Sequence, residues 1–375
     1  MKKRILLLSG YDAASHRYWR RTLENNLSEF EWTQLSLPDR HFSWRTRGSS
    51  LTFAFERQQE LSGDYDLLIA TSMVDLAALR GFLPHLGLLP TIVYFHENQF
   101  VYPISKEQPN LLNAQLTSIY SALCADQILF NSNYNRNTFL NGAAKLLQRM
   151  PDGAPASLIH TLKNKCDVIA VPLEDCIGNS TNDSQKREQP ETTERTKIIA
   201  PAKILWNHRW EYDKQPEIFF DALLLLKKAG YSFKLNVVGQ SFRTIPSCFQ
   251  LAKEQLASHI EYWGHQPRET YQLILQSSDL VVSTASHDFQ GLSMLEAIHA
   301  GCTPVAPDSL VYPEYIPESL RYATAQTPQQ ETANLLALLT QILAADERQP
   351  ISVNNYLVSH LIPEYRAIFN RLIAR

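Results

Sequence analysis

The stretch "DLVVSTASHDFQGLSMLEAIHAGCTPVAP", residues 279–307, contains an apolar run, a polar loop, a segment that begins at a glycine, and a second apolar run. Short apolar runs bounded by turn residues predict buried strands, and the longer segment between them has the periodicity of a helix. A strand, a helix and another strand in this order are typical of a parallel sheet covered by helices. The stretch therefore predicts the α/β fold class.

The same alternation extends over both halves of the chain. In the first half we expect strands at 4–10, 65–72, 90–98, 126–132 and 166–172, separated by helices at 16–27, 73–82, 110–125 and 133–143. In the second half we expect strands at 198–206, 233–239, 260–264, 279–286 and 302–307, separated by helices at 215–230, 248–259, 268–278 and 291–301. Each half therefore predicts a Rossmann-like, doubly wound parallel sheet.

A polar segment divides the two predicted domains. A chain of 375 residues is longer than the chains that usually fold around a single hydrophobic core, so two domains are expected. We predict an N-terminal domain at 1–172, a polar linker or mobile insertion at 173–197, a C-terminal domain at 198–355, and a C-terminal helix at 356–375 that packs back on the first domain. Ligands of such sheets bind at the carboxyl ends of the strands, which are expected to surround one central cleft.

The composition is that of an ordinary globular protein, with 44% hydrophobic residues, 19% charged residues and a net charge of −3. Five cysteines without a Cys-x-x-Cys pair indicate reduced thiols rather than disulfides or a zinc site. The apolar run after "MKKR" is too short for a secretory signal, and no stretch approaches the ~20 apolar residues of a membrane span. We therefore expect a cytoplasmic protein without a membrane partner.

Polar residues follow two strands of the first half. His96 begins the run "HENQ" after "TIVYF", where an imidazole can bond a hydroxyl or act as a base, although a lone histidine is often only structural. Ser15 follows the first strand and either caps the next helix or faces a ligand. The glycine pattern of a dinucleotide site is missing there, which weakens an assignment to the NAD-dependent enzymes.

The loop "HRWEYDKQP" after the strand at 198–206 carries Arg209 and Lys214. A guanidinium and an ammonium before a helix N-terminus suit a diphosphate, since one binds oxygens bidentately and the other is a point charge. The alternative is a solvated basic loop, in which Glu211 pairs with Lys214.

The loop after the strand at 279–286 carries Asp288 and leads to Gly291 and Glu296. Gly291 permits close approach to the backbone N–H groups that begin a helix. A carboxylate accepts two hydroxyls at once, which suits the vicinal diol of a ribose or hexose. The alternatives are a helix cap for Asp288 and a surface acid for Glu296. Glu296, however, lies in an apolar helix where a buried acid needs a partner.

This combination of two Rossmann-like halves, an Arg-(x4)-Lys loop and an acid-(x7)-Glu loop and helix resembles the GT-B glycosyltransferases of the retaining family 4 type. The resemblance implies that Arg209 and Lys214 bind the donor diphosphate and that Glu296 binds the ribose hydroxyls. It also implies that Asp288 and the adjacent backbone bind the hexose and that His96 contacts the sugar near the reacting carbon. Asp288 stands where the family usually has Glu, and Ala13-Ala14 replaces the family's Gly-Gly.

Seven collinear segments give a narrower resemblance, to the tRNA-queuosine α-mannosyltransferases. They are "FSWRTRGSSL", "LIATSMVDLAALRGFLPHLG", "YFHENQFVYP", "ILFNSNYNRNTFL", "WNHRWEYDKQPEIFF", "HDFQGLSMLEAIHAGC" and "LVYPEYIP". The resemblance implies transfer of mannose, with retention, from GDP-mannose to the cyclopentenediol of queuosine in a tRNA anticodon. It implies a nucleotide sugar as co-substrate, no metal cofactor and no obligate protein partner.

The first 50 residues hold nine Lys or Arg and five acids, which indicates either a binding surface for a nucleic-acid acceptor or a solvated basic surface. The segment "HFSWRTR" interleaves Trp44 with Arg45 and Arg47, a mixture suited to stacking on unpaired bases and binding phosphates. Since GT-B acceptors usually meet the N-terminal half, acceptor contacts are also predicted for the loop residues Ser15, His16 and Asn98.

Two other functions remain open at this point. The first is a GT-B glycosyltransferase with a glycan or small-molecule acceptor, because the donor-side segments would survive a change of acceptor. The second is a nucleotide- or RNA-binding protein that has lost catalysis, which the presence of His96, Arg209, Lys214 and Glu296 disfavours.

Overall fold

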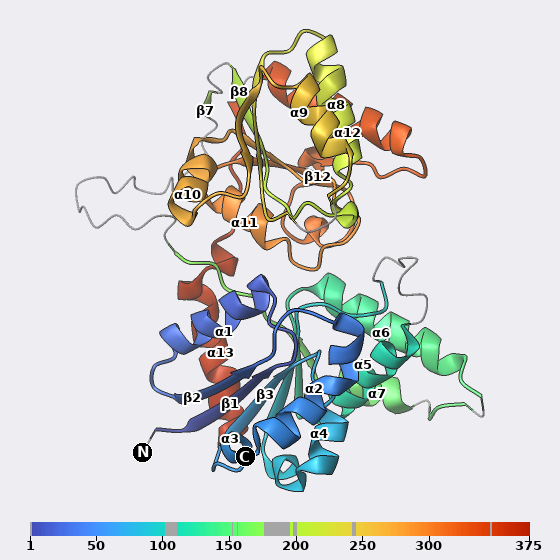
Figure 1. Ribbon diagram of the computed structural model, residues 1–375, viewed down its shortest axis with the longest axis vertical. Coiled ribbons are helices and arrows are strands. Elements are labelled where there is room, and N and C mark those ends of the chain that lie inside the picture. Colours follow the sequence, from blue (N-terminus) through green and yellow to red (C-terminus); the bar gives the residue numbers. More distant parts are fainter. Residues whose placement is uncertain are drawn as a thin grey trace. The chain divides into compact units, whose positions relative to one another are not determined.

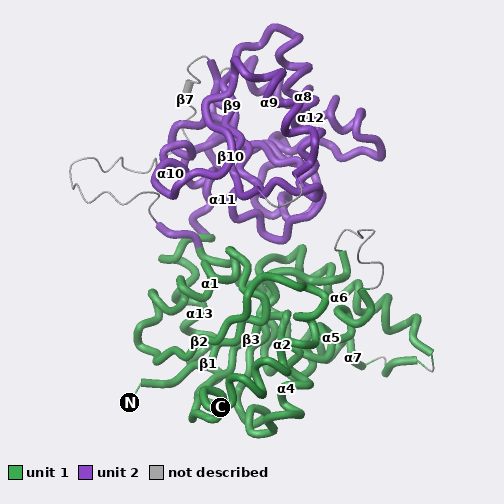
Figure 2. The backbone as a smooth tube through the Cα atoms, in the orientation of Figure 1, with its two compact units in different colours: residues 1–172, 356–375 green, residues 173–355 purple. Residues whose placement is uncertain are grey.

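The computed structural model describes residues 2–101, 111–151, 153–155, 157–175, 196–197, 201–241, 245–345 and 347–375 (Figure 1). The chain forms two compact units. The first comprises Met1–Pro172 together with Tyr356–Arg375, and the second comprises Leu173–Asn355 (Figure 2). Most of the predicted linker, residues 176–195, lies outside the described residues.

The first unit is built on a parallel sheet of six strands in the order β2-β1-β3-β4-β5-β6. The strands are β1 (Arg4–Ser9), β2 (Glu31–Ser36), β3 (Leu67–Thr71), β4 (Thr91–Phe95), β5 (Gln127–Phe130) and β6 (Cys166–Val168). Strands β3, β4 and β5 are buried along their whole length, which explains their continuous apolar runs.

Helices cover both faces of this sheet. They are α1 (Ala14–Asn26), α2 (Phe42–Glu56), α3 (Gln58–Leu61), α4 (Leu76–Phe82), η1 (Pro84–Leu88), α5 (Leu112–Cys124), α6 (Asn133–Gln148), α7 (Ser157–Lys163) and α13 (Val358–Ile373). Phe95 of β4 lies in one apolar cluster with Phe53 of α2 and Phe139 of α6. Tyr94 points to the other face, where its ring stacks on Trp19 of α1.

The C-terminal helix α13 belongs to the first unit (Figure 1). The hydroxyl of Tyr365 accepts a hydrogen bond from Trp19 Nε1 at 3.0 Å and donates one to the carbonyl of Ala170 at 3.0 Å. Because Tyr365 is fully buried, both contacts fix α13 against α1 and the end of the sheet.

The second unit repeats the design with a parallel sheet in the order β10-β9-β8-β11-β12-β13. Its strands are β8 (Ala202–Trp206), β9 (Phe233–Val238), β10 (Ile260–Gly264), β11 (Leu280–Val282), β12 (Thr303–Pro307) and β13 (Arg321–Tyr322). Its helices are η2 (Tyr212–Lys214), α8 (Pro216–Lys228), α9 (Cys248–Gln255), α10 (Arg268–Ser277), α11 (Leu292–His299), η3 (Tyr312–Glu314), η4 (Glu318–Leu320), α12 (Pro328–Ala345) and η5 (Asn354–Tyr356). A small antiparallel pair joins β7 (Thr196–Lys197) to β14 (Glu347–Arg348).

The predicted fold class, two doubly wound parallel sheets, is confirmed. Sequence reasoning left out β2, α2 and α12. Strand β2 is an edge strand whose residues are exposed or half-buried, so it lacks the apolar run of a central strand. Among the described residues, no helix combines the length and the apolar character that crossing a membrane requires.

Candidate functional site

In the second unit, Lys214 is the buried cation of the loop that follows β8, with 6% of its surface exposed. Its Nζ donates a hydrogen bond to the carbonyl of His287 at 2.5 Å. The same nitrogen lies 3.3 Å from Asp213 Oδ2 and 3.6 Å from Asp288 Oδ1. A buried ammonium needs such oxygen partners, and here they come from its own loop and from the loop after β11.

Asp288 is held by a tyrosine from η3 as well as by Lys214. The hydroxyl of Tyr312 donates to Asp288 Oδ2 at 2.8 Å and lies 2.6 Å from the hydroxyl of Ser283. Burial alone would raise the pKa of Asp288, but Lys214, His208 and the Tyr312 hydrogen bond together hold it below its usual value. Asp288 is therefore a fixed anion, and it is not the cap of α11.

The N-cap of α11 is Gly291, which adopts a left-handed conformation with φ 72°. A Cβ at this position would come within 2.6 Å of the hydroxyl oxygen of Tyr315. Both constraints favour glycine, since an L-residue would be strained and would collide. The helix N–H groups after Gly291 thus begin next to a tyrosine hydroxyl and the Asp288 loop.

Glu296 lies in α11 and is bonded by a tyrosine of α10. The hydroxyl of Tyr271 donates to Glu296 Oε2 at 2.9 Å and accepts a hydrogen bond from Asn207 Nδ2 at 3.1 Å. The same Asn207 nitrogen donates to the carbonyl of Ser293 at 2.8 Å. Burial raises the pKa of Glu296, and the Tyr271 hydrogen bond offsets part of that rise. Glu296 therefore has an internal partner, and the ligand that its sequence context suggested stays a prediction.

Arg209 is half exposed, unlike Lys214. Its Nη1 pairs with Glu211 Oε2 at 2.7 Å, and its Nη2 lies 3.8 Å from Asp213 Oδ2. The alternative in which Glu211 is the ion-pair partner of Lys214 is wrong, because Glu211 pairs with Arg209 and Lys214 pairs with Asp213 and Asp288. The two predicted diphosphate ligands thus occupy different environments in one loop.

Two buried histidines, His208 and His287, interact electrostatically with Lys214 and Asp288. Desolvation, with a smaller contribution from Lys214, lowers the pKa of both His208 and His287 to about 4. Both imidazoles are therefore neutral near pH 7, and Lys214 is the buried cation among Asp288, Asp213 and these rings. Such an arrangement suits a ligand that brings both negative oxygens and hydroxyl groups.

In the first unit, His96 follows β4 and stacks on His16 of α1. Their ring centroids are 3.9 Å apart with an interplanar angle of 19°, and the edges of Trp19 and Tyr94 complete the surroundings of His96. Burial lowers the pKa of His16 to about 4 and that of His96 well below its usual value. Among the described residues, no partner hydrogen-bonds His96 Nε2 or His16 Nδ1. The structure brings these two predicted residues together as neutral rings.

Two other predicted acceptor residues have defined local positions. Ser15 is the second residue of α1, whose N-cap is Ala13, so the capping alternative is wrong. Asn98 is buried, and its Nδ2 donates to the backbone oxygen and side chain of Asn135 and to Thr138. These bonds hold the loop after β4 to α6, and acceptor contacts by Ser15 and Asn98 stay predictions.

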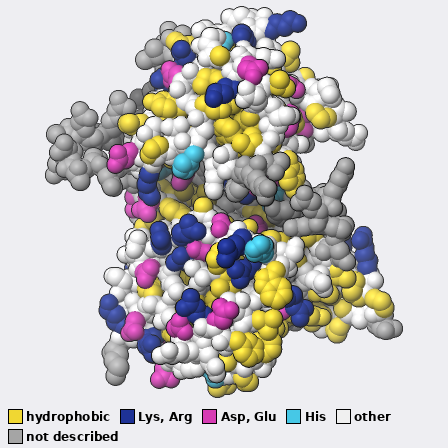
Figure 3. All heavy atoms as spheres, in the orientation of Figure 1, with side chains coloured by type: hydrophobic (Ala, Val, Ile, Leu, Met, Phe, Trp, Pro, Cys, Tyr) yellow, Lys and Arg dark blue, Asp and Glu magenta, His cyan; other side chains and the backbone are white. Residues whose placement is uncertain are grey.

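The three predicted acceptor residues of α2 differ in accessibility. Trp44 is 57% exposed, whereas Arg45 is only 9% exposed. The Arg47 side chain is 62% exposed and its Nε pairs with Asp75 Oδ2 at 2.9 Å. Figure 3 shows Lys and Arg side chains gathered beside hydrophobic ones on one face of the first unit. Trp44 and Arg47 are accessible to a partner, whereas little of Arg45 is exposed, and acceptor contacts by all three stay predictions.

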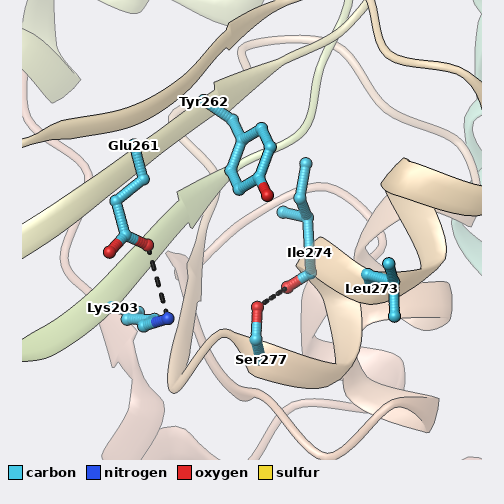
Figure 4. A pocket seen from close by; sticks show the side chains of 6 residues that line it. All are labelled: Lys203, Glu261, Tyr262, Leu273, Ile274 and Ser277. Carbon is cyan, nitrogen blue, oxygen red and sulfur yellow. Dashed lines mark hydrogen bonds and ion pairs between the residues drawn. The ribbon is translucent and has the colours of Figure 1, made fainter.

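A pocket of about 660 Å³ lies in the second unit away from these loops (Figure 4). It is lined by Lys203, Glu261, Tyr262, Leu273, Ile274 and Ser277. Lys203 and Glu261 belong to the amino-terminal halves of the parallel strands β8 and β10, whereas the predicted ligands follow strand carboxyl ends. The pocket contains no predicted site residue.

Sequence reasoning missed four residues that hold the site together. Asn207 and His208 stand directly after β8, so the rule of searching loops after strands could have found them. Tyr312 lies in the segment "LVYPEYIP", but its contact with Asp288 bridges 24 positions. Tyr271 lies inside α10, 25 positions before Glu296, and no local pattern marks it.

Comparisons with known proteins support one family throughout the chain. Residues 4–173 match the family described as "tRNA-queuosine alpha-mannosyltransferase N-terminal", and residues 188–349 match "Glycosyl transferases group 1". The chain is 33% identical over 377 residues to the tRNA-queuosine alpha-mannosyltransferase of Drosophila melanogaster, covering 100% of this chain and 98% of that protein.

Solved structures share the fold at low sequence identity. Sucrose-phosphate synthase from Thermosynechococcus elongatus superposes with a TM-score of 0.71 at 13% identity, covering 100% of both chains. The pneumococcal O-GlcNAc transferase GtfA, in complex with UDP and GlcNAc, gives a TM-score of 0.62 at 13% identity, covering 85% of this chain and 60% of that one. The chain thus spans less than two thirds of GtfA. These likenesses agree with the GT-B fold expected from the sequence.

The full-length relative and the two consecutive family matches cover both units, including the stacked histidines of the first unit and Lys214 and Glu296 of the second. The chain is a glycosyltransferase and belongs to the tRNA-queuosine alpha-mannosyltransferase family.

Proposed function

We propose that this protein transfers mannose from GDP-mannose, with retention of the anomeric configuration, to a hydroxyl of the cyclopentenediol of queuosine in a tRNA anticodon. The observation that carries the proposal is the full-length match to a tRNA-queuosine alpha-mannosyltransferase. The Lys214–Asp288 ion pair and the separately oriented carboxylate of Glu296 support it, because a buried cation and two oriented carboxylates suit a nucleotide sugar.

In this proposal the donor binds to the loops after β8 and β11. Lys214 and Arg209 stabilise the departing diphosphate, and the N–H groups that begin α11 add partial positive charge. Glu296 accepts the ribose hydroxyls, and Asp288 accepts a hydroxyl of the mannose. His96 contacts the transferred sugar as a neutral imidazole.

The reaction proposed is a front-face displacement. The bond between the anomeric carbon and the diphosphate oxygen breaks to leave an oxocarbenium-like sugar, and the queuosine hydroxyl attacks from the same face. The proton of that hydroxyl passes to an oxygen of the departing diphosphate, so the products are GDP and mannosyl-queuosine tRNA. The protein contributes mainly by stabilising the charge that develops on the leaving group.

The test compares two tRNA preparations that differ only in queuosine. Each is incubated with the full chain and GDP-mannose, the tRNA is digested, and the masses of the nucleosides are measured by mass spectrometry. A hexose increment on the queuosine-containing tRNA alone supports the proposal, and no increment on either tRNA refutes it. UDP-glucose and GDP-glucose in place of GDP-mannose test the donor, and the anomeric coupling of the product tests retention.

Metal dependence is tested in the same assay. Among the described residues, no group of three or more His, Cys, Asp or Glu is arranged to hold a metal ion. We therefore expect a metal-independent transfer, which is tested by adding EDTA to the assay. Unchanged product formation supports this expectation, and a loss of product that Mg²⁺ restores contradicts it.

A further inference from the structure

Glu296 has one hydrogen-bonding partner among the described residues, the hydroxyl of Tyr271, and this contact has no part in the function proposed so far. Glu296 is a half-buried residue of α11, and desolvation of its carboxylate disfavours the charged form. Arg268 acts on it only through space and forms no ion pair with it among the described residues. The orientation of this carboxylate therefore depends on Tyr271.

The Tyr271 hydroxyl is a permanent donor. Burial, with a further contribution from Glu296, raises its pKa well above the ordinary tyrosine value, so the hydroxyl keeps its proton near neutral pH. Its oxygen also accepts a hydrogen bond from Asn207 Nδ2 at 3.1 Å. A hydroxyl that accepts one hydrogen bond donates a stronger one, because the two polarise each other.

The same network connects three elements. Asn207 directly follows β8, Tyr271 belongs to α10, and Glu296 belongs to α11. Because Asn207 Nδ2 also donates to the carbonyl of Ser293, it fixes the first turn of α11 to the beginning of the Arg209 loop. Glu296 Oε2 is thereby directed toward Tyr271, and the other oxygen, Oε1, has no hydrogen-bond donor among the described residues.

We propose that Tyr271 is a positioning residue for nucleotide recognition, which fixes Glu296 Oε2 so that Oε1 accepts the ribose hydroxyls of a nucleoside diphosphate. This inference rests on the proposed binding of the donor ribose by Glu296 and adds the residue that orients that carboxylate. Its consequence is that removing the Tyr271 hydroxyl weakens binding only for ligands that carry ribose hydroxyls.

The test measures the affinity of the full chain for GDP and for 2′,3′-dideoxy-GDP by calorimetric titration. Tyr271→Phe removes one oxygen and keeps the ring. We expect it to weaken GDP binding about 3- to 10-fold, because Glu296 no longer accepts the ribose hydroxyls well. The affinity for dideoxy-GDP should not change, because this nucleotide has no ribose hydroxyls and makes no such hydrogen bond with either protein. Tyr262→Phe is the matched control, since the Tyr262 hydroxyl has no hydrogen bond among the described residues, and it should change neither affinity.

The outcomes separate this inference from the proposed function. An equal loss for both nucleotides makes the contact merely structural and overturns the inference, as does unchanged GDP binding. A wild-type chain that binds both nucleotides equally well refutes the ribose role of Glu296 itself. Wild-type binding of UDP or ADP in place of GDP refutes the proposed donor, and the comparison of ribose with dideoxyribose is then made on that nucleotide.

A second variant guards against a Tyr271→Phe chain that does not fold. Asn207→Ala removes the N–H that polarises the Tyr271 hydroxyl but leaves that hydroxyl on Glu296. We expect a smaller loss in the same direction, again for GDP and not for dideoxy-GDP. A loss of equal size for the two nucleotides contradicts the inference.

Discussion

Each unit has a parallel sheet of six strands covered by helices, although the strand orders differ, and the two units place their buried functional groups in opposite electrostatic environments. In the first unit, His16 and His96 lie stacked among aromatic rings and are kept neutral by burial. In the second unit, Lys214 and Asp288 face oppositely charged or hydrogen-bonding groups, which hold the pKa of Asp288 below its usual value. Desolvation acts on both sites, and the presence or absence of compensating partners decides whether a group stays charged.

This difference has a functional consequence. A neutral imidazole can exchange hydrogen bonds with a sugar hydroxyl without attracting counterions, whereas a fixed ammonium stabilises the negative charge of a leaving diphosphate. Single substitutions in either unit test this contrast between an uncharged first site and a charged second site whose charges are paired.

The largest effect is expected at the Lys214–Asp288 pair. Lys214→Met leaves Asp213 and Asp288 buried without their common cation, which should lower the free energy of unfolding by about 3 kcal/mol or more. Asp288→Asn should cost less, because Lys214 keeps Asp213 and the carbonyl of His287 as partners. The double variant should lose less than the sum of the two, and both singles should abolish transfer. Urea unfolding of the full chain measures this. Lys203→Met is the control, since its pair with Glu261 is partly exposed and should contribute less than about 1 kcal/mol.

The next effect concerns the neutral site. His96→Gln keeps a polar group but loses the imidazole, and we expect kcat for mannose transfer to fall roughly 10²-fold, the size typical of one lost catalytic hydrogen bond. His85→Gln, at an exposed histidine of the same unit that bonds the carbonyl of Leu61, should leave kcat unchanged. A His96→Gln chain with wild-type kcat would falsify the role of His96.

Acid should destabilise the first unit through His16. The unfolded chain protonates this histidine below about pH 6.5, whereas the folded chain does so only near pH 4, so the unfolded state binds more protons between these values. The stability supplied by a neutral His16 is therefore lost as the pH falls through this window. Between pH 7 and 5, His16→Gln should reduce the loss of unfolding free energy by about 2 kcal/mol relative to the wild type. Equal losses in both proteins would contradict this expectation.

A smaller effect is expected at Tyr312. Tyr312→Phe removes the hydroxyl that donates to Asp288, and kcat/KM for the donor should fall about tenfold, since hydrogen bonds to charged groups are the stronger ones. Tyr322→Phe provides a matched control, because the Tyr322 hydroxyl is also buried but donates to the carbonyl of Ser283. If the two variants lose activity equally, Tyr312 has no special role in orienting Asp288.

The smallest effect is expected at Arg47. The Arg47 side chain is exposed, whereas its partner Asp75 is buried and also accepts a hydrogen bond from the N–H of Ala78, so Arg47→Ala should lower the free energy of unfolding by only about 1 kcal/mol. It should weaken tRNA binding about threefold, reduce the salt dependence of that binding, and leave GDP affinity intact. Arg57→Ala, at an exposed arginine after the same helix, serves as control in a filter-binding titration. Unchanged tRNA affinity for Arg47→Ala would exclude it from the acceptor surface.

Much of the fold was predictable because each central strand is a continuous apolar run and each covering helix has apolar residues at helical spacing. Strand β2 and helix α2 escaped because β2 is a partly exposed edge strand and α2 is apolar on more than one face. The sequence also did not reveal which side chains of the segment "HFSWRTR" are exposed. Trp44, Arg45 and Arg47 look equivalent in the sequence, yet α2 turns Arg45 inward and leaves the other two accessible.

The two doubly wound units were predictable from the sequence, because strand, loop and helix signals are local. So were the positions of His96, Lys214 and Asp288 after strands and of Glu296 in a helix. Only the tertiary structure decided what each of them meets. Tyr271 reaches Glu296 and Tyr312 reaches Asp288 from other elements of the second unit, and His16 stacks on His96 across the first. Such pairs depend on how elements pack against one another, and packing brings together residues whose separation in the sequence carries no signal.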